Sequence, residues 1–187
     1  MNILVDKLPT DYEGLKINTN FRSFILFELL MQDNKIEKED KIILALNLFY
    51  DEIPEDINKA FDGILWFYTK GKYKKEEVEE EKTQKNNKKK IYSYEYDADF
   101  IYTAFLDQYG VDLNEIDHLH WFKFKAMFEG LKSDNKICEI MGYRAVDIGK
   151  IKDKEEKKRY KKLQREWALP DDRTEEEKER DFADAFW

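Results

Sequence analysis

A run of charged and polar residues interrupts this chain near its middle and limits how it can fold. Residues 74–90 consist of lysine, glutamate, glutamine, asparagine and threonine around one aliphatic residue, Val78. Such a segment has almost no apolar surface to bury, and burial is what offsets the entropy lost on folding. We interpret it as a linker between two folded halves. The alternative is a solvated extension of the helix that precedes it.

The parts on either side of this segment are rich in residues that form a core. Hydrophobic residues make up 42% of the 187 positions and aromatic residues 15%, which argues against intrinsic disorder despite the 40% of charged residues. Seven glycines and three prolines leave long stretches without helix breakers. We therefore predict a mainly α protein, a helical bundle in two halves. The predicted divisions are an N-terminal helical domain (1–73), the linker (74–90), a C-terminal helical domain (91–170) and an acidic tail (171–187).

Two short segments show patterns typical of β structure. Within residues 3–17, the turn-forming residues 11–14 separate the aliphatic run 3–5 from an alternating pattern at 15–17. This order predicts a small hairpin or an extended lead-in. Residues 92–96 alternate as Tyr-Ser-Tyr-Glu-Tyr, which predicts a short strand.

Three helices are predicted in the first half. Thr19 or Asn20 can cap the first of them. The second covers about 39–50 and is apolar nearly all round, so we expect it to be a central, buried helix. Pro54 fits the first turn of the third helix, and Gly71 ends it.

Four more helices are predicted in the second half. Asp97 can cap a helix that closes at Gly110, since glycine is favoured where a helix ends. Further helices are indicated at about 116–131, 134–142 and 153–167, each from the spacing of its apolar residues.

Motifs that carry catalysis or metal binding are missing from the sequence. No glycine-rich phosphate-binding motif occurs. His118 and His120 are the only histidines, and on the predicted helix they point about 200° apart, so they cannot chelate one metal. We expect one to face solvent and the other to form a hydrogen bond near the core. Cys138, the single cysteine, is better explained as a small buried apolar residue than as a nucleophile. We therefore predict no enzymatic activity, no cofactor and no metal.

The charge distribution disfavours nucleic acid as the main partner. The net charge is −8 and the isoelectric point is near 5.0, whereas phosphate contacts need a basic surface. Residues 150–165 are locally basic, but acidic residues are interspersed, so we interpret them as the solvated face of a helix. The apolar runs are shorter than the roughly 20 residues of a membrane-spanning helix, so we expect a soluble protein.

The acidic tail ends in aromatic residues, Phe182, Phe186 and Trp187. Large aromatic side chains are costly to expose, so they must dock on something. They either dock on the body of the same chain or place a helix in the groove of a partner. The sequence leaves both alternatives open.

An ordered set of motifs over residues 1–169 resembles the bacteriophage gene-product-fifteen family of phages and prophages of Gram-positive bacteria. In the second half these motifs are DFIYTAF (99–105), QYGVDL (108–113), LHWFKF (119–124), IMGYR (140–144), YKKL (160–163) and WAL (167–169). In the first half they are LP (8–9), NTNFR (18–22) and WFY (66–68). Phe122 stands where the pattern leads us to expect a second tryptophan, a departure that changes no chemistry.

This resemblance implies a role in tail assembly. Such proteins resemble tail-assembly chaperones because their genes lie between those of the major tail protein and the tape-measure protein. The implied function is to keep the tape-measure protein soluble in the host cytoplasm, with the tape-measure protein or another tail protein as partner and self-association as a further expectation. The alternatives are a structural tail or connector component and a nucleic-acid-binding regulator. The resemblance implies no catalytic residues. The residues that we expect to contact a partner are Trp121, Arg144, Tyr160, Trp167, Phe182, Phe186 and Trp187.

Overall fold

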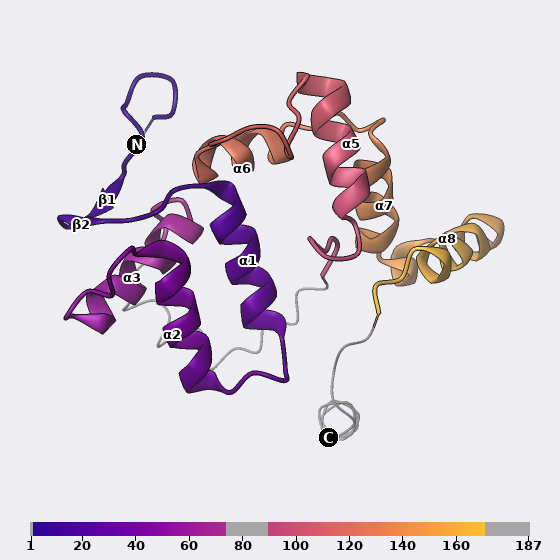
Figure 1. The fold of residues 1–187 in the computed structure, drawn as a ribbon. Helices are drawn as coiled ribbons and strands as arrows, with labels where there is room; N and C mark the ends of the chain where they lie inside the picture. Colours follow the sequence, from indigo (N-terminus) through magenta and orange to yellow (C-terminus); the bar gives the residue numbers. More distant parts are fainter. Residues whose placement is uncertain (1, 74–89, 171–187) are drawn as a thin grey trace.

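The chain folds into two groups of helices that are joined through one of them (Figure 1). The computed structural model describes residues 2–73 and 90–170. The first group contains α1 (Phe21–Gln32), α2 (Lys38–Phe49) and α3 (Ile57–Tyr68). The second contains α5 (Ala98–Tyr109), α6 (Trp121–Glu129), α7 (Lys136–Ala145), the 3-10 turn η1 (Ile148–Lys150) and α8 (Lys154–Glu166). The predicted mainly α architecture is confirmed.

A small hairpin precedes α1. Strands β1 (Asp11–Tyr12) and β2 (Leu15–Lys16) pair antiparallel. Glu13 and Gly14 connect them with φ angles of 49° and 87°, as a two-residue turn with positive φ at both positions requires. The hairpin predicted within residues 3–17 is therefore confirmed at 11–16. Residues 3–5 form a turn.

The strand predicted at 92–96 is wrong, because these residues lie in the turn that leads into α5. The Ser93 amide donates to the Asp97 carboxylate (2.9 Å), and the Ser93 hydroxyl accepts from the Glu95 amide (3.2 Å). Local side-chain hydrogen bonds of serine and aspartate compete with strand pairing. Of the alternating tyrosines, Tyr94 is buried in the core, whereas Tyr96 is exposed.

Local capping signals predicted most helix ends well. Asn20 caps α1, its side chain accepting from the Arg22 amide at 3.1 Å. Gly110 ends α5 with φ 64°. Pro54, however, lies before α3 and not in its first turn. Asp56 caps this helix instead, because its carboxylate accepts from the Lys59 amide at 2.9 Å.

The second helix does contact both other helices of its group, as a central helix should, but the prediction that it is buried is wrong. Helix α2 lies between α1 and α3 and packs against both (Figure 1). Its buried residues are Ala45, Leu46 and Phe49. Three consecutive aliphatic residues remain exposed by 39%, 52% and 43%, namely Ile42, Ile43 and Leu44. A run of apolar residues shows which side chains can be buried, but it does not show how many neighbouring helices will pack against them.

One hydrophobic core extends through both groups, because α6 packs against α1 and α3 as well as α5. Phe124 stacks on Phe21 of α1 and on Phe105 of α5, with ring centroids 4.9 and 5.0 Å apart. Trp121 stacks on Phe24 at 4.9 Å. Aromatic pairs at these distances contribute beyond the area that they bury. Helix α6 is thus the element that joins the two halves.

The backbone makes the same junction, since the N-terminal ends of α1 and α6 pair with each other. The backbone pairs Asn20 with His120 as a single antiparallel bridge. Two hydrogen bonds flank it, from the Phe21 amide to the Leu119 carbonyl (2.9 Å) and from the Trp121 amide to the Thr19 carbonyl (2.8 Å). We call these residues, 19–21 and 119–121, the helix-start junction.

The helix predicted from residue 116 begins only at Trp121, so His118 and His120 precede it. His118 is exposed and His120 is buried, in agreement with one facing solvent and one near the core. The Phe122 amide donates to Nδ1 of His120 (3.1 Å), and Nε2 lies 2.9 Å from the Pro9 carbonyl oxygen. A carbonyl only accepts and an amide only donates, so the neutral tautomer with the proton on Nε2 satisfies both contacts. Burial lowers the pKa of His120.

Acid should weaken the fold through His120. Burial lowers the pKa of His120 in the folded state below the ordinary histidine pKa of 6.5. The contribution of neutral His120 to the free energy of unfolding is therefore fully present above pH 6.5 and is lost as the pH falls through the folded-state pKa. We expect the free energy of unfolding, from urea titrations at pH 7.5 and 5.5, to decrease in the wild type. The decrease should be smaller in His120→Asn and unchanged in the control His118→Asn. An equal effect of both substitutions would contradict the assignment.

Proteases should cleave first within residues 74–90, where the sequence offers little to bury. Because α6 completes the core of the first group, the two fragments should remain together after cleavage. Limited proteolysis followed by gel filtration and mass spectrometry tests both points. First cuts within α2 or α6 would show that the predicted division into domains is wrong. Separation of the nicked fragments would show that the shared core does not hold them.

Candidate partner-binding surface

Trp121 is a core residue and is not available to a partner in this conformation. Its side chain is 1% exposed and lies against Phe24 and Tyr68. The indole N–H donates to the Tyr68 carbonyl at 3.2 Å. The expectation that Trp121 contacts a partner therefore needs correction. The large apolar side chain of Trp121 packs α6 against the first group of helices and is not exposed for a partner.

Arg144 is also internal, with 5% of its surface exposed. Its guanidinium forms a two-pronged ion pair with Asp97, with contacts of 2.6 and 3.0 Å. It also donates to the carbonyls of Trp167 (2.6 Å) and Ile91 (3.1 Å). We call this group the Arg144 clamp. It fixes the turn before α5, the end of α7 and the end of α8, so its position assigns Arg144 a structural role in place of the expected partner contact.

Tyr160 and Trp167 lie where α8 meets the body, and both are half-buried. The Trp167 ring meets Phe100 edge-on at 5.8 Å, and the Lys136 ammonium lies 4.8 Å from its centre. Direct partner contact by these two residues stays a prediction. The other three residues expected to contact a partner, Phe182, Phe186 and Trp187, lie outside the described residues.

Removal of the Arg144 guanidinium should be strongly destabilising. Arg144→Met leaves the Asp97 carboxylate buried without its partner, which typically costs about 3–5 kcal/mol. Arg144→Lys should recover only part of this, since an ammonium cannot reproduce the planar fork. The control Glu139→Gln breaks the exposed Lys136–Glu139 pair and should cost less than about 1 kcal/mol. Urea unfolding measures all three; a loss below 1 kcal/mol for Arg144→Met would refute the clamp.

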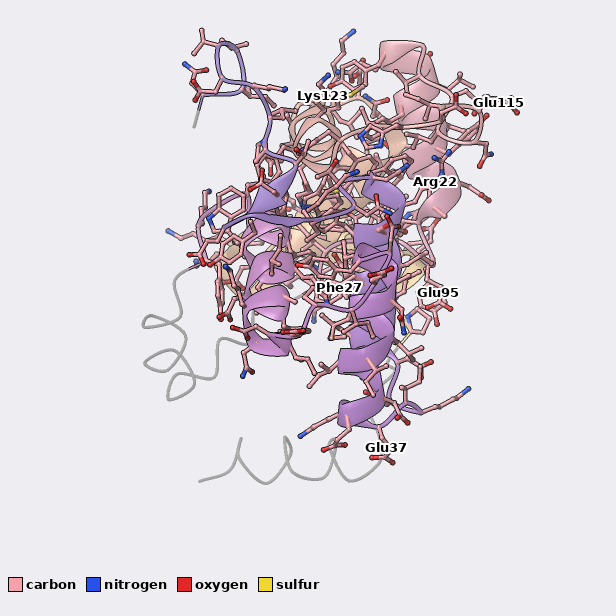
Figure 2. The ribbon with its side chains drawn as sticks, turned by 60° about the vertical axis from the view of Figure 1, so that its left-hand side comes forward. Arg22, Phe27, Glu37, Glu95, Glu115 and Lys123 are labelled. Atoms are coloured by element: carbon pink, nitrogen blue, oxygen red, sulfur yellow. The ribbon has the colours of Figure 1, made fainter. Side chains whose placement is uncertain are left out.

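The structure presents a groove between α1 and the segment that enters α5. One side of α1 carries Arg22, Ile25, Leu29 and Gln32, which are three or four residues apart and therefore share a face. Two hollows of about 470 Å³ each lie along this face. Figure 2 shows Arg22 and Glu95, one from each hollow, on the same side of α1. We call the two hollows together the α1–α5 groove.

The floor of the upper hollow is apolar. It is formed by Phe21, Ile25, Tyr94, Ile101 and Phe124. These residues come from α1, the turn before α5, α5 itself and α6, so the floor exists only when both groups of helices are assembled. Leu29 and Tyr96 provide apolar surface in the lower hollow, whose other lining residues are polar or charged, namely Gln32, Asp33, Asn34, Lys35 and Glu95.

The rim of the groove is polar and held in place by hydrogen bonds. The Arg22 guanidinium donates to the carbonyls of Leu113 (2.7 Å) and Asn114 (3.2 Å). The Tyr102 hydroxyl donates to Asp112 at 3.1 Å. The Asn114 amide is the main cause that holds the pKa of Asp112 below its ordinary value. A rigid polar rim around an apolar floor is suited to binding the apolar face of a helix.

The exposed residues of α2 do not form a comparable surface. Ile42, Ile43 and Leu44 are consecutive, and neighbouring residues of a helix point about 100° apart. They therefore present separate side chains and not one continuous patch. The groove is the better candidate for partner binding.

The described residues offer no arrangement that indicates another chemistry. Within residues 2–73 and 90–170 there is no cluster of three or more histidine, cysteine, aspartate or glutamate residues that could hold a metal ion. Cys138 is partly buried, and burial raises the pKa of its thiol. Among the helices of the described parts, none is long and apolar enough to cross a membrane.

The comparisons with known proteins give one finding. A family model described as "Bacteriophage Gp15 protein" matches residues 4–169. The matched range contains the whole α1–α5 groove, the helix-start junction and the Arg144 clamp. No curated protein and no solved structure matches the chain.

Proposed function

This chain belongs to the bacteriophage Gp15 family of phage structural or assembly proteins, and we propose that it acts as a tail-assembly chaperone. In this proposal it binds the tape-measure protein and keeps it soluble while the tail is built. The binding site is the α1–α5 groove. The apolar floor of its upper hollow, continued by Leu29 and Tyr96 in the lower one, is the observation that carries the proposal.

The dimensions of the groove suit a helix of a partner. From Arg22 to Gln32, α1 advances by about 15 Å, which is close to three helical turns. An amphipathic helix presents anchors at positions i, i+3, i+4 and i+7, which span about 10 Å and fit within this length. A tape-measure protein is long and helix-rich, so its exposed apolar stripes are the surface that such a groove would cover.

Covering an apolar surface requires no catalysis. The chaperone would act in the host cytoplasm without nucleotide, cofactor or metal. Its net charge of −8 would keep the complex soluble, because proteins far from zero charge resist association. Nucleic acid has no part in the proposal.

Charges placed in the groove should abolish partner binding. We expect Ile25→Glu combined with Leu29→Glu to reduce co-purification with the co-expressed tape-measure protein at least about tenfold, since each buried apolar side chain contributes about 1.5–3 kcal/mol. Tyr96→Ala, on the exposed opposite wall, should weaken binding without affecting the fold. The matched control, Ile42→Glu with Ile43→Glu, places the same charges on α2. Its binding should equal that of the wild type.

Several results would contradict this proposal. If the α2 control loses the partner as completely as the groove variant, while both keep the wild-type melting temperature, the groove is not the site. If the wild type neither binds nor solubilises the tape-measure protein, the chaperone function is wrong. Mass spectrometry of purified particles gives a further check. Stoichiometric recovery of the chain there would indicate a structural component instead.

A further inference from the structure

Helix α8 projects from the second group of helices and is held along one side only (Figure 1). It packs against α7 and η1. Tyr160 and Leu163 are half-buried on this inner side, and the Gln164 amide donates to the carbonyls of Tyr143 (2.9 Å) and Val146 (2.7 Å). No residue of α8 is fully buried. The outer side of the helix is therefore a free face in the described structure.

The outer side of α8 carries a continuous line of positive charge. Five exposed cations lie at positions i, i+4, i+7, i+8 and i+11, namely Lys154, Lys158, Lys161, Lys162 and Arg165. This spacing places them on one face. None of them forms an ion pair with another described residue. A surface hollow lies along the same helix, and its lining residues are Lys158, Arg159, Lys161, Lys162 and Arg165 together with Glu155 and Glu166. We call these five residues the basic face of α8.

The acidic tail of this chain complements the basic face in charge. Residues 171–187 contain eight acidic and three basic residues, a net charge of −5. The basic face carries +5. Attraction between such surfaces at close range is strong at low salt and is screened within about 8 Å at physiological ionic strength. The tail must therefore lie directly against α8 to benefit from it.

Chain length and connectivity favour the tail of the same molecule over that of a second copy. Only residues 167–170 separate α8 from the tail, and connections of two to five residues join antiparallel neighbouring helices. Helix α8 has 13 residues and spans about 20 Å. Seventeen residues span about 25 Å as a helix and more when extended, enough to follow α8 over its whole length. A short tether also gives a millimolar effective concentration.

We propose that the acidic tail, residues 171–187, docks in cis along the basic face of α8. An antiparallel return brings Phe182, Phe186 and Trp187 toward the first turns of α8. Lys154 and Lys158 lie in these turns, and their ammonium groups can form cation–π interactions with aromatic rings. The docked tail neutralises the charge of the basic face, which therefore attracts other polyanions less strongly.

Zero-length cross-linking of an isotope mixture tests this proposal. The full-length chain is prepared in natural-abundance and ¹⁵N-labelled form, mixed in equal amounts and treated with a carbodiimide, which joins lysines to carboxylates in contact. We expect cross-links from Lys154, Lys158, Lys161 and Lys162 to carboxylates of residues 171–184, each within peptides of one isotope. Lys152, which is exposed and nearby but off the basic face, serves as the reference.

Charge reversal provides the matched variants. Lys158→Glu, Lys161→Glu and Arg165→Glu together should reduce the tail cross-links of Lys154 and Lys162 at least about tenfold. Lys38→Glu, Lys132→Glu and Lys152→Glu reverse as many exposed charges elsewhere and should leave the cross-links unchanged.

Three results would overturn the proposal. Cross-links of mixed isotope composition would place the tail on a second copy. Tail cross-links no more frequent at the basic face than at Lys152 would show that the tail does not dock there. Salt-dependent binding of single-stranded DNA by the full-length chain, lost in the basic-face variant, would show that the face is open to nucleic acid.

Discussion

The pairing of two helix starts is the interaction on which this fold depends. Each helix begins with backbone N–H groups that have no partner within the helix, and burying them unpaired is costly. At the helix-start junction, the Asn20 and His120 side chains accept from the first turns of α1 and α6. The amides of Phe21 and Trp121 donate across to the opposite chain segment. The junction thus satisfies both helix starts at once and joins residues that are one hundred positions apart.

The candidate binding groove is a consequence of that junction. It holds Trp121 and Phe124 against the aromatic rings of α1, while Phe105 packs α5 on the other side of Phe124. Helix α6 therefore stands between α1 and α5 at one end and keeps them apart. Phe124 itself is part of the floor that this separation leaves open. A protein that binds apolar helices needs apolar surface that its own folding does not cover, and this arrangement provides it.

Local signals in the sequence predicted more of the fold than of the site. The cap Asn20 and the closing Gly110 depend on backbone groups a few residues away, so their positions could be inferred. Trp121 and Arg144 drew attention as candidates for partner contact, but their partners, Phe24 and Asp97, lie far away in the sequence. No local pattern shows whether an aromatic or charged residue will find such a partner. The exposure of α2 and the pairing that delays α6 to residue 121 were missed for the same reason.

The Arg144 clamp connects the fold to the ends of the described chain. A buried ion pair adds little net stability, because desolvation offsets the attraction, but it strongly favours the one arrangement in which every donor is paired. The donors of Arg144 reach the Ile91 carbonyl, where the chain re-enters after the charged segment, and the Trp167 carbonyl, where it leaves α8. The clamp thereby fixes the direction in which α8 projects and the point from which the acidic tail departs. The proposed docking of the acidic tail on the basic face begins from this fixed end, because the tail follows residue 170 directly in the sequence.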